Sequence, residues 1–278
     1  MYITGMAGTS KIQVLKSLVE IFQQKNESHH LLIVAPTGSA AALLKGLTYH
    51  SAFGINSDGS PSSNIQLAQV KSRLEGVDYI FLDEVSMLSC CDLYLISARL
   101  AHVMNNLDTP FGRLNMIFAG EFTQLPPVIS QEHASLYSHM IGRNTTSLCN
   151  QESSIGKALW HQVTTVVILH QNMHQRSQME DDAKFCDALS NMRYKAFTPA
   201  DITFLKSRVS RKLPGCPNIK EKQFRNVSII TSLNSQKDEI NDLGLGSEIF
   251  GSETMQELMD FYSIDTVPTK DSEDTHER

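Results

Sequence analysis

Short, continuous apolar runs alternate along the chain with longer stretches in which apolar residues recur every three or four positions. Continuous runs are typical of parallel strands buried on both faces, and the longer period is typical of amphipathic helices. The pattern therefore predicts an α/β fold, in which helices flank a parallel sheet. The predicted strands are residues 31–35, 79–82, 115–119, 163–169 and 227–231.

Two segments, 15–22 and 93–107, carry apolar residues at helical spacing and are predicted to pack against the sheet. Three further features are more polar. They are a loop over residues 55–64, a charged helix over 178–194 and a helix start at 198–199.

Composition is that of an ordinary globular protein: 41% of the 278 residues are hydrophobic and 19% are charged. The length and a change of texture after about residue 170 indicate two domains. We predict a first domain over residues 1–165, the start of a second over 166–265, and a disordered polar tail over 266–278.

Charge and cysteine content exclude several classes of protein. The net charge of −6 argues against a broad nucleic-acid coat but leaves room for a narrow basic groove. The 5 cysteines lack the spacing of a disulfide framework or a zinc site. The longest apolar runs are far shorter than the ~20 residues that span a bilayer, so we expect a soluble, intracellular protein.

The segment 5–12 is a turn of small residues that leads into the first amphipathic helix. Backbone N–H groups at such a helix start can surround a phosphate, and Lys11 is placed to meet the terminal phosphates of a nucleotide. Two residues depart from the phosphate-loop pattern. Ser10 replaces a glycine, and Ile12 replaces the hydroxyl residue that ligates magnesium. A glycine-rich turn that binds no ligand is the alternative.

Asp83 and Glu84 come directly after the predicted strand 79–82. Ligands of open α/β sheets bind at the carboxyl ends of the strands. There, Asp83 would hold a magnesium ion through water, and Glu84 would orient or deprotonate the water that attacks a γ-phosphate. The alternative is a pair of acids at a helix N-terminus, where carboxylates are also favoured.

Gln124 lies in the segment 119–128, which follows the predicted strand 115–119 and contains two consecutive prolines. A glutamine held by such a rigid segment could sense a γ-phosphate through a hydrogen bond. A tight turn after a strand, without any such role, is the alternative.

Together with residues 35–41 and 48–51, these three segments have the order and spacing of helicase motifs. The chain resembles the Pif1-like DNA helicases of superfamily 1, especially the fungal Helitron-type members. Later segments, at 169–173, 232–234 and 238–241, resemble the same family. The resemblance implies two RecA-like domains that close on ATP and Mg²⁺ while single-stranded DNA lies across both.

The resemblance also implies roles for individual residues. Lys11, Glu84 and Gln124 would be catalytic, and Asp83 would bind magnesium through water. The residues implied in ATP binding are Gly5, Ala7, Gly8, Thr9, Ser10, Lys11 and Ile12, and those implied in DNA binding are Pro36, Thr37, His50 and Ser51. For the whole protein it implies a monomer, a nuclear location, 5′-to-3′ movement, and roles in DNA repair, recombination and telomere maintenance.

Several departures from the family pattern predict an inactive or impaired helicase. His174 stands where the family places an arginine that reaches the γ-phosphate, a role worth about 10³ to 10⁵ in rate, and Arg176 is a candidate substitute. The short strand before Gly5 and the missing last motif predict a truncated copy with an incomplete second domain. The alternative is a non-catalytic remnant that binds single-stranded DNA or nucleotide. A small P-loop kinase or GTPase is disfavoured, because neither explains residues 120–128.

Two other clusters are weaker candidates for a site. His170 and His174 have the spacing of metal ligands, but no cysteine or acid completes a set, so a metal site is disfavoured. The basic stretch 206–225 could contact a phosphate backbone, or it could be a solvated surface.

Overall fold

The computed structural model describes residues 1–6, 8–56, 63–127, 135–138, 148–170, 180–209 and 229–242. Contacts divide the chain into two units, residues 1–206 and 207–278. No helix among the described residues is long and apolar enough to cross a membrane.

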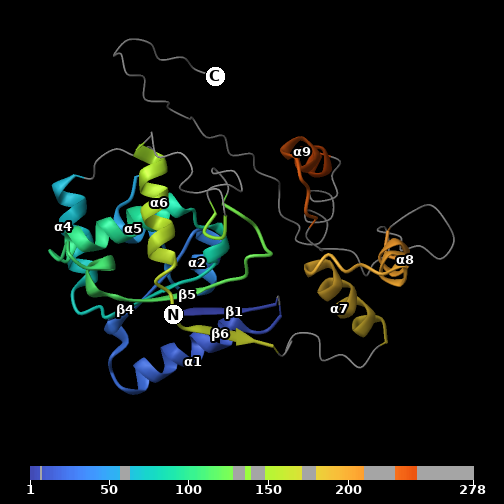
Figure 1. Cartoon of the computed structure of the whole chain (residues 1–278), viewed down its shortest axis with the longest axis horizontal. Helices are drawn as coiled ribbons and strands as arrows, with labels where there is room; N and C mark the ends of the chain where they lie inside the picture. The colour runs from blue at the N-terminus through green and yellow to red at the C-terminus, as the bar shows by residue number, and fades with distance from the viewer. Residues whose placement is uncertain are drawn as a thin grey trace, which may run out of the picture. The chain divides into compact units, whose positions relative to one another are not determined.

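A parallel sheet of 6 strands forms the centre of the first unit, and its strand order is β3-β2-β4-β5-β1-β6 (Figure 1). All of its pairings are parallel. The strands are β1 (Tyr2–Gly5), β2 (Leu31–Ala35), β3 (Leu47–Thr48), β4 (Tyr79–Leu82), β5 (Asn115–Ala119) and β6 (Val166–Leu169).

Helices connect most of these strands. The α-helices are α1 (Lys11–Gln24), α2 (Gly38–Leu43), α3 (Tyr49–Phe53), α4 (Asn64–Leu74), α5 (Cys90–Val103), α6 (Leu148–Trp160), α7 (Glu180–Arg193), α8 (Pro199–Ser207) and α9 (Asn234–Asp242). Short 3₁₀ helices are η1 (Ser28–His30), η2 (Val85–Met87) and η3 (Pro110–Arg113).

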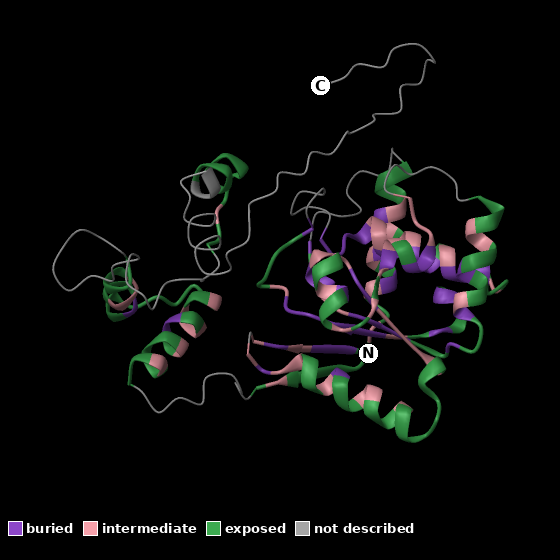
Figure 2. Ribbon diagram, turned by 180° about the vertical axis from the view of Figure 1, so that it is seen from behind, coloured by how far each residue is buried: buried purple, intermediate pink, exposed green. Residues whose placement is uncertain are grey.

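Most residues of β1, β4 and β5 are buried (Figure 2), and the strand residues belong to two separate cores. Ile80 and Leu82 of β4 belong to the larger core, which α3, α4, α5 and α6 complete. Phe81 lies between them in sequence, and it packs instead with Leu15 of α1 in the smaller core. Strands buried on both faces are continuous apolar runs, which is the pattern that the sequence shows.

The single tryptophan of the chain, Trp160 at the end of α6, packs among three aromatic rings. Its ring centroid lies 5.3 Å from that of Tyr2, 5.5 Å from that of Phe118 and 5.5 Å from that of Phe122. The cluster joins β1, the end of β5 and the turn that follows β5.

The predicted α/β fold, with a parallel sheet flanked by helices, is confirmed. Three strands have the predicted limits, at 31–35, 79–82 and 115–119, and β6 covers the second half of the predicted 163–169. The prediction of a strand at 227–231 is wrong for residues 229–231, which have no strand structure, while 227 and 228 lie outside the described residues.

The helix predictions also hold. Helix α1 contains the predicted segment 15–22, α5 covers residues 93–103 of the predicted segment 93–107, and α7 covers most of the predicted charged helix. Helix α8 starts after Thr198, whose hydroxyl accepts a hydrogen bond from the Asp201 backbone N–H at 3.2 Å. Most of the predicted loop 55–64 lies outside the described residues, as does the predicted tail.

The predicted domain limits stay a prediction. Strand β6 begins at Val166, one residue after the predicted end of the first domain, and it pairs with β1 in the central sheet. The two contact units divide after Lys206.

Candidate functional site

The three segments singled out from the sequence follow three neighbouring strands. β4, β5 and β1 are adjacent and parallel, so their carboxyl ends meet at one edge of the sheet. Gly5 ends β1, Asp83 follows β4, and Gly120 follows β5. The fold therefore brings the candidate phosphate loop, the two carboxylates and the glutamine turn to the same edge.

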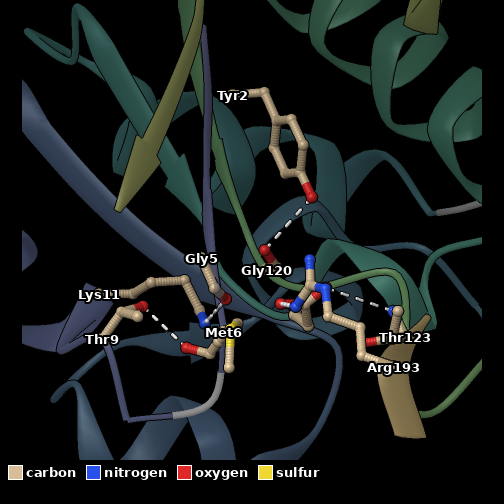
Figure 3. A network of polar contacts seen from close by, with 9 residues as sticks. Tyr2, Gly5, Met6, Thr9, Lys11, Gly120, Thr123 and Arg193 are labelled. Atoms are coloured by element: carbon tan, nitrogen blue, oxygen red, sulfur yellow. Dashed lines mark hydrogen bonds and ion pairs between the residues drawn. The ribbon is translucent and has the colours of Figure 1, made fainter. Parts of the chain in front are cut away.

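The candidate phosphate loop folds back on itself through hydrogen bonds (Figure 3). The Thr9 hydroxyl and backbone N–H both donate to the Met6 carbonyl oxygen, at 2.7 and 3.1 Å. The Lys11 ammonium donates to the Gly5 carbonyl oxygen at 2.9 Å. A Cβ atom at Gly5 would lie only 2.7 Å from the carbonyl oxygen of Leu169, so the close pairing of β1 and β6 requires glycine there. Ala7 lies outside the described residues.

Ser10 adopts a conformation that suits glycine. Its φ and ψ are 61° and 42°, in the left-handed region, and its side chain makes no capping hydrogen bond to α1. L-residues are strained there because Cβ approaches the carbonyl oxygen. The family pattern has glycine at this position, and the geometry gives a physical reason for it.

Ile12 lies in the first turn of α1 with 41% of its surface exposed. Its side chain has no oxygen, so it cannot ligate a cation. The structure therefore offers no hydroxyl ligand at this point of the loop.

Asp83 and Glu84 form a partly buried pair of carboxyls near Lys11. Burial raises the pKa of Asp83, while the Glu84 backbone N–H and the Lys11 charge act in the opposite direction. Burial also raises the pKa of Glu84, the Asp83 charge adds to the rise, and Lys11 opposes it. The Lys11 charge therefore favours the ionised form of both carboxyls.

The alternative reading of this pair, as acids that cap a helix, receives little support. Glu84 precedes η2, but its side chain makes no capping hydrogen bond. Its φ and ψ of 52° and 44° are strained for a residue other than glycine. Residues held in such conformations concentrate at functional sites.

Gly120 brings the turn after β5 against the turn after β4. A Cβ atom at Gly120 would lie 2.8 Å from the Val85 nitrogen and 3.0 Å from its Cγ1. The φ of Gly120 is +152°, which other residues rarely adopt. The backbone after Glu84 therefore packs directly on the backbone before Gln124.

Gln124 is exposed in its turn, and its backbone N–H donates to the Glu121 carbonyl oxygen at 3.0 Å. The Glu121 side chain is buried and forms an ion pair with Arg193, the last residue of α7 (Figure 3). Arg193 was not among the residues predicted from the sequence. A glutamate two residues after a buried strand is a signal that a cationic partner is near, but nothing in the sequence indicates which residue it is.

The candidate DNA-binding residues follow β2 and β3, which are neighbours in the sheet. Pro36 and Thr37 come after β2, and the Thr37 hydroxyl accepts a hydrogen bond from the Ala40 backbone N–H at 3.2 Å, which caps α2. His50 stacks on Tyr49, with the ring centroids 3.9 Å apart. His50 and Ser51 lie at the start of α3.

A cavity of about 300 Å³ lies beside His50 and Ser51, between α3 and α4. Its lining is mostly polar and includes Gln66, Gln69 and Arg73. The Arg73 guanidinium donates to the Ser51 and Ala52 carbonyl oxygens, at 2.9 and 2.6 Å, which ties α4 to the end of α3.

The candidate arginine substitute, Arg176, lies outside the described residues, as does His174. Most of the basic stretch 206–225 does too. Among the described residues, no group of three or more histidine, cysteine, aspartate or glutamate side chains could hold a metal ion.

Sequence comparison places these features in a family. A sequence model of the PIF1-like helicase matches residues 1–198. The ATP-dependent DNA helicase Pif1 of Psychrobacter sp. (strain PRwf-1) is 33% identical over 135 residues, 47% of this chain and 20% of that protein. The ATP-dependent DNA helicase PIF1 of Emericella nidulans is 27% identical over 220 residues, 76% of this chain and 27% of that protein. The chain thus spans a fifth to about a quarter of these relatives.

Solved structures agree on the fold. The crystal structure of Bacteroides Pif1 bound to ssDNA superposes with a TM-score of 0.61 at 23% identity, over 89% of this chain and 53% of that one. The crystal structure of Pif1 helicase from Candida albicans gives 0.61 at 21% identity, over 87% and 50%. The sheet is therefore that of a RecA-like helicase domain, while the likeness to fungal Helitron-type members stays a prediction. Because the family match covers more than half of its length, the chain belongs to the PIF1-like helicase family.

Proposed function

We propose that this chain is a PIF1-like motor unit that binds ATP with Mg²⁺ at the carboxyl edge of its sheet and contacts single-stranded DNA through the segments after β2 and β3. The observation that carries the proposal is the strand order, in which Gly5, at the start of the loop that contains Lys11, and the Asp83–Glu84 pair follow strands that end at the same edge of the sheet. In phosphoryl-transfer sites a lysine contacts the nucleotide phosphates, and carboxylates hold the Mg²⁺ ion that bridges them.

The residues present fit a nucleotide. The Lys11 ammonium already lies over the loop, where it binds the Gly5 carbonyl oxygen, and it would exchange this acceptor for β- and γ-phosphate oxygens. Asp83 would hold Mg²⁺ through water, and Glu84 would orient or deprotonate the attacking water. Gln124, in the turn packed against Glu84, would sense the γ-phosphate. A bound magnesium ion would neutralise phosphate charge.

We propose further that hydrolysis is impaired. The strained backbone of Ser10 and the apolar side chain of Ile12 weaken the loop that holds nucleotide and magnesium. His174 adds the loss of an arginine, since a histidine with a pKa near ~6.5 is mostly neutral at pH 7. The departures at Ser10 and Ile12 also favour a second candidate function, that of a remnant that binds nucleotide or DNA without hydrolysing ATP. Movement in the 5′-to-3′ direction, which the family resemblance implies, and a nuclear location, which the fungal relatives suggest, are proposed here only for the whole protein.

The first test is DNA-stimulated phosphate release by the purified chain, with Lys11→Ala as the control. The purified chain and the Lys11→Ala control should both release phosphate at close to the uncatalysed rate, because the arginine loss alone raises the barrier of the purified chain by about 4–7 kcal/mol. Release well above the Lys11→Ala rate would contradict impairment. It would also indicate that Arg176, or an arginine from another chain, has taken over the role.

The second test is binding of a fluorescent ATP analogue by the same two proteins. The unmodified chain should bind it in a Mg²⁺-dependent manner, and Lys11→Ala should bind at least tenfold more weakly. Failure of the unmodified chain to bind at millimolar concentration would overturn the nucleotide site itself, whatever the rate of phosphate release.

A further inference from the structure

We propose that Arg193 is a positioning residue, whose ion pair with Glu121 holds the turn 120–124 in the form that presents Gln124 to the nucleotide. The inference rests on the proposed function, because it takes Gln124 as the phosphate sensor. Arg193 lies on α7, 72 residues away in sequence from Glu121, so the pair links two distant parts of the first unit.

The Glu121 carboxylate connects the turn to α7. One oxygen, Oε2, pairs with the Arg193 guanidinium. The other, Oε1, accepts a hydrogen bond from the Thr123 backbone N–H at 3.5 Å, one residue before Gln124 (Figure 3). The Glu121 carboxylate therefore joins α7 to the backbone of the turn 120–124, which we call the sensor turn.

The other side of the turn is held by β1. The Tyr2 hydroxyl donates to the Gly120 carbonyl oxygen at 3.3 Å (Figure 3). The pKa of Tyr2 is raised, mainly by burial, and the charges of Glu121 and Arg193 act on it with opposite signs. Tyr2, Glu121 and Arg193 thus form one polar cluster at the start of the turn.

Burial makes this pair different from an ordinary surface ion pair. The Glu121 side chain is 3% exposed and that of Arg193 is 22% exposed. On the same helix, Lys184 and Glu180 form a pair at 2.8 Å whose side chains are 51% and 84% exposed. Exposed pairs contribute little, whereas removing one partner of a buried pair leaves an uncompensated charge that the local structure must move to hydrate. Without Arg193, the turn that carries Glu121 is the part that would rearrange.

The experiment compares Arg193→Ala, Arg193→Lys and the matched control Lys184→Ala in the full chain. Hydrogen exchange measures the Thr123 and Gln124 amides, whose acceptors both belong to Glu121. We expect exchange at least tenfold faster in Arg193→Ala, partial restoration in Arg193→Lys, and no change in Lys184→Ala. Unchanged exchange at these two amides in a folded Arg193→Ala protein would overturn the proposal, and this readout needs no nucleotide.

A second readout is the ratio of affinities for a non-hydrolysable ATP analogue and for ADP. Arg193→Ala, which should displace the sensor turn, should lower this ratio at least fivefold and leave the affinity for ADP unchanged. If both residues act through the same turn, adding Gln124→Ala to Arg193→Ala should lower the ratio no further. A merely structural role would lower stability without changing the ratio, and additive effects would likewise contradict the proposal. If the unmodified chain bound neither nucleotide, the proposed function would fail while the exchange result still decided the role of Arg193.

Discussion

Ser10 shows how one side chain can act against the backbone that carries it. Replacement by glycine should stabilise the chain by about 0.5–1 kcal/mol, because relief of about 1–2 kcal/mol of left-handed strain exceeds the entropic cost of glycine in the unfolded chain. Urea unfolding measures the change. The control is Ser10→Ala, which keeps the Cβ atom and should bring no gain. Equal stability of the glycine and alanine variants would show that Ser10 is not strained.

The carboxyl pair predicts a dependence of stability on pH. Burial raises the pKa of Asp83 in the folded chain, so the folded state holds its proton to higher pH than the unfolded state does. Stability from this group is therefore fully present below the unfolded pKa, near ~3.8, and is lost as the pH rises through the folded pKa. Asp83→Asn should be more stable than the unmodified chain at pH 7.5, and this advantage should shrink as the pH falls towards ~4.

Asp108→Asn, which changes an exposed carboxylate, is the matched control for urea unfolding across this pH range. It should follow the unmodified chain at every pH. An Asp83→Asn protein that is less stable than the unmodified chain at pH 7.5 would show that the carboxylate is stabilised by its surroundings rather than strained by them.

At the scale of elements, the contact between the turns after β4 and β5 should depend on Gly120. Gly120→Ala should cost about 1–3 kcal/mol of stability, because the new Cβ atom meets the Val85 backbone and the backbone must shift. It should also weaken binding of the magnesium nucleotide, since the shift moves Glu84. Gly38→Ala, where nothing lies within 4 Å of the added atom, should be neutral or stabilising. Similar losses in both variants would contradict the proposed close contact.

The elements themselves were largely predictable, because strands buried on both faces must be continuous apolar runs. Strand β6 was less so: the predicted strand 163–169 also included Thr164 and Thr165, whereas only Val166–Leu169 pair with β1, and Val166 and Ile168 are 52% and 56% exposed at the edge of the sheet. A common edge for the segments that carry Lys11, Asp83 and Gln124 was also expected, because each segment directly follows an apolar run and ligand residues of open sheets gather at the carboxyl ends of the strands. The Glu121–Arg193 pair did not, because a contact across 72 residues leaves no periodic signal in the sequence.

For the whole molecule, we expect weak binding of single-stranded DNA. The net charge is −6, and phosphate contacts supply most of the affinity of proteins for DNA. Fluorescence anisotropy with an oligothymidine should give a Kd of micromolar order or weaker that rises with salt. His50→Ala, which removes a ring stacked on Tyr49 beside the cavity, should weaken binding about threefold to tenfold.

The matched control for DNA binding is His102→Ala, which removes an exposed histidine from the last turn of α5. It should leave the affinity unchanged. Nanomolar affinity at physiological salt would show that residues beyond the segments after β2 and β3 dominate the contact with DNA. Equal effects of the two histidine changes would remove His50 from the proposed DNA surface.

The aromatic cluster around Trp160 gives the protein a built-in optical reporter. The indole packs against Phe122, the neighbour of Glu121 in the turn 120–124, and it is the only indole in the chain. Its emission therefore reports the state of that turn without any label. Nucleotide binding that moves the turn should shift the intensity or wavelength of this emission, and the same signal should distinguish Arg193→Ala from Lys184→Ala before any ligand is added.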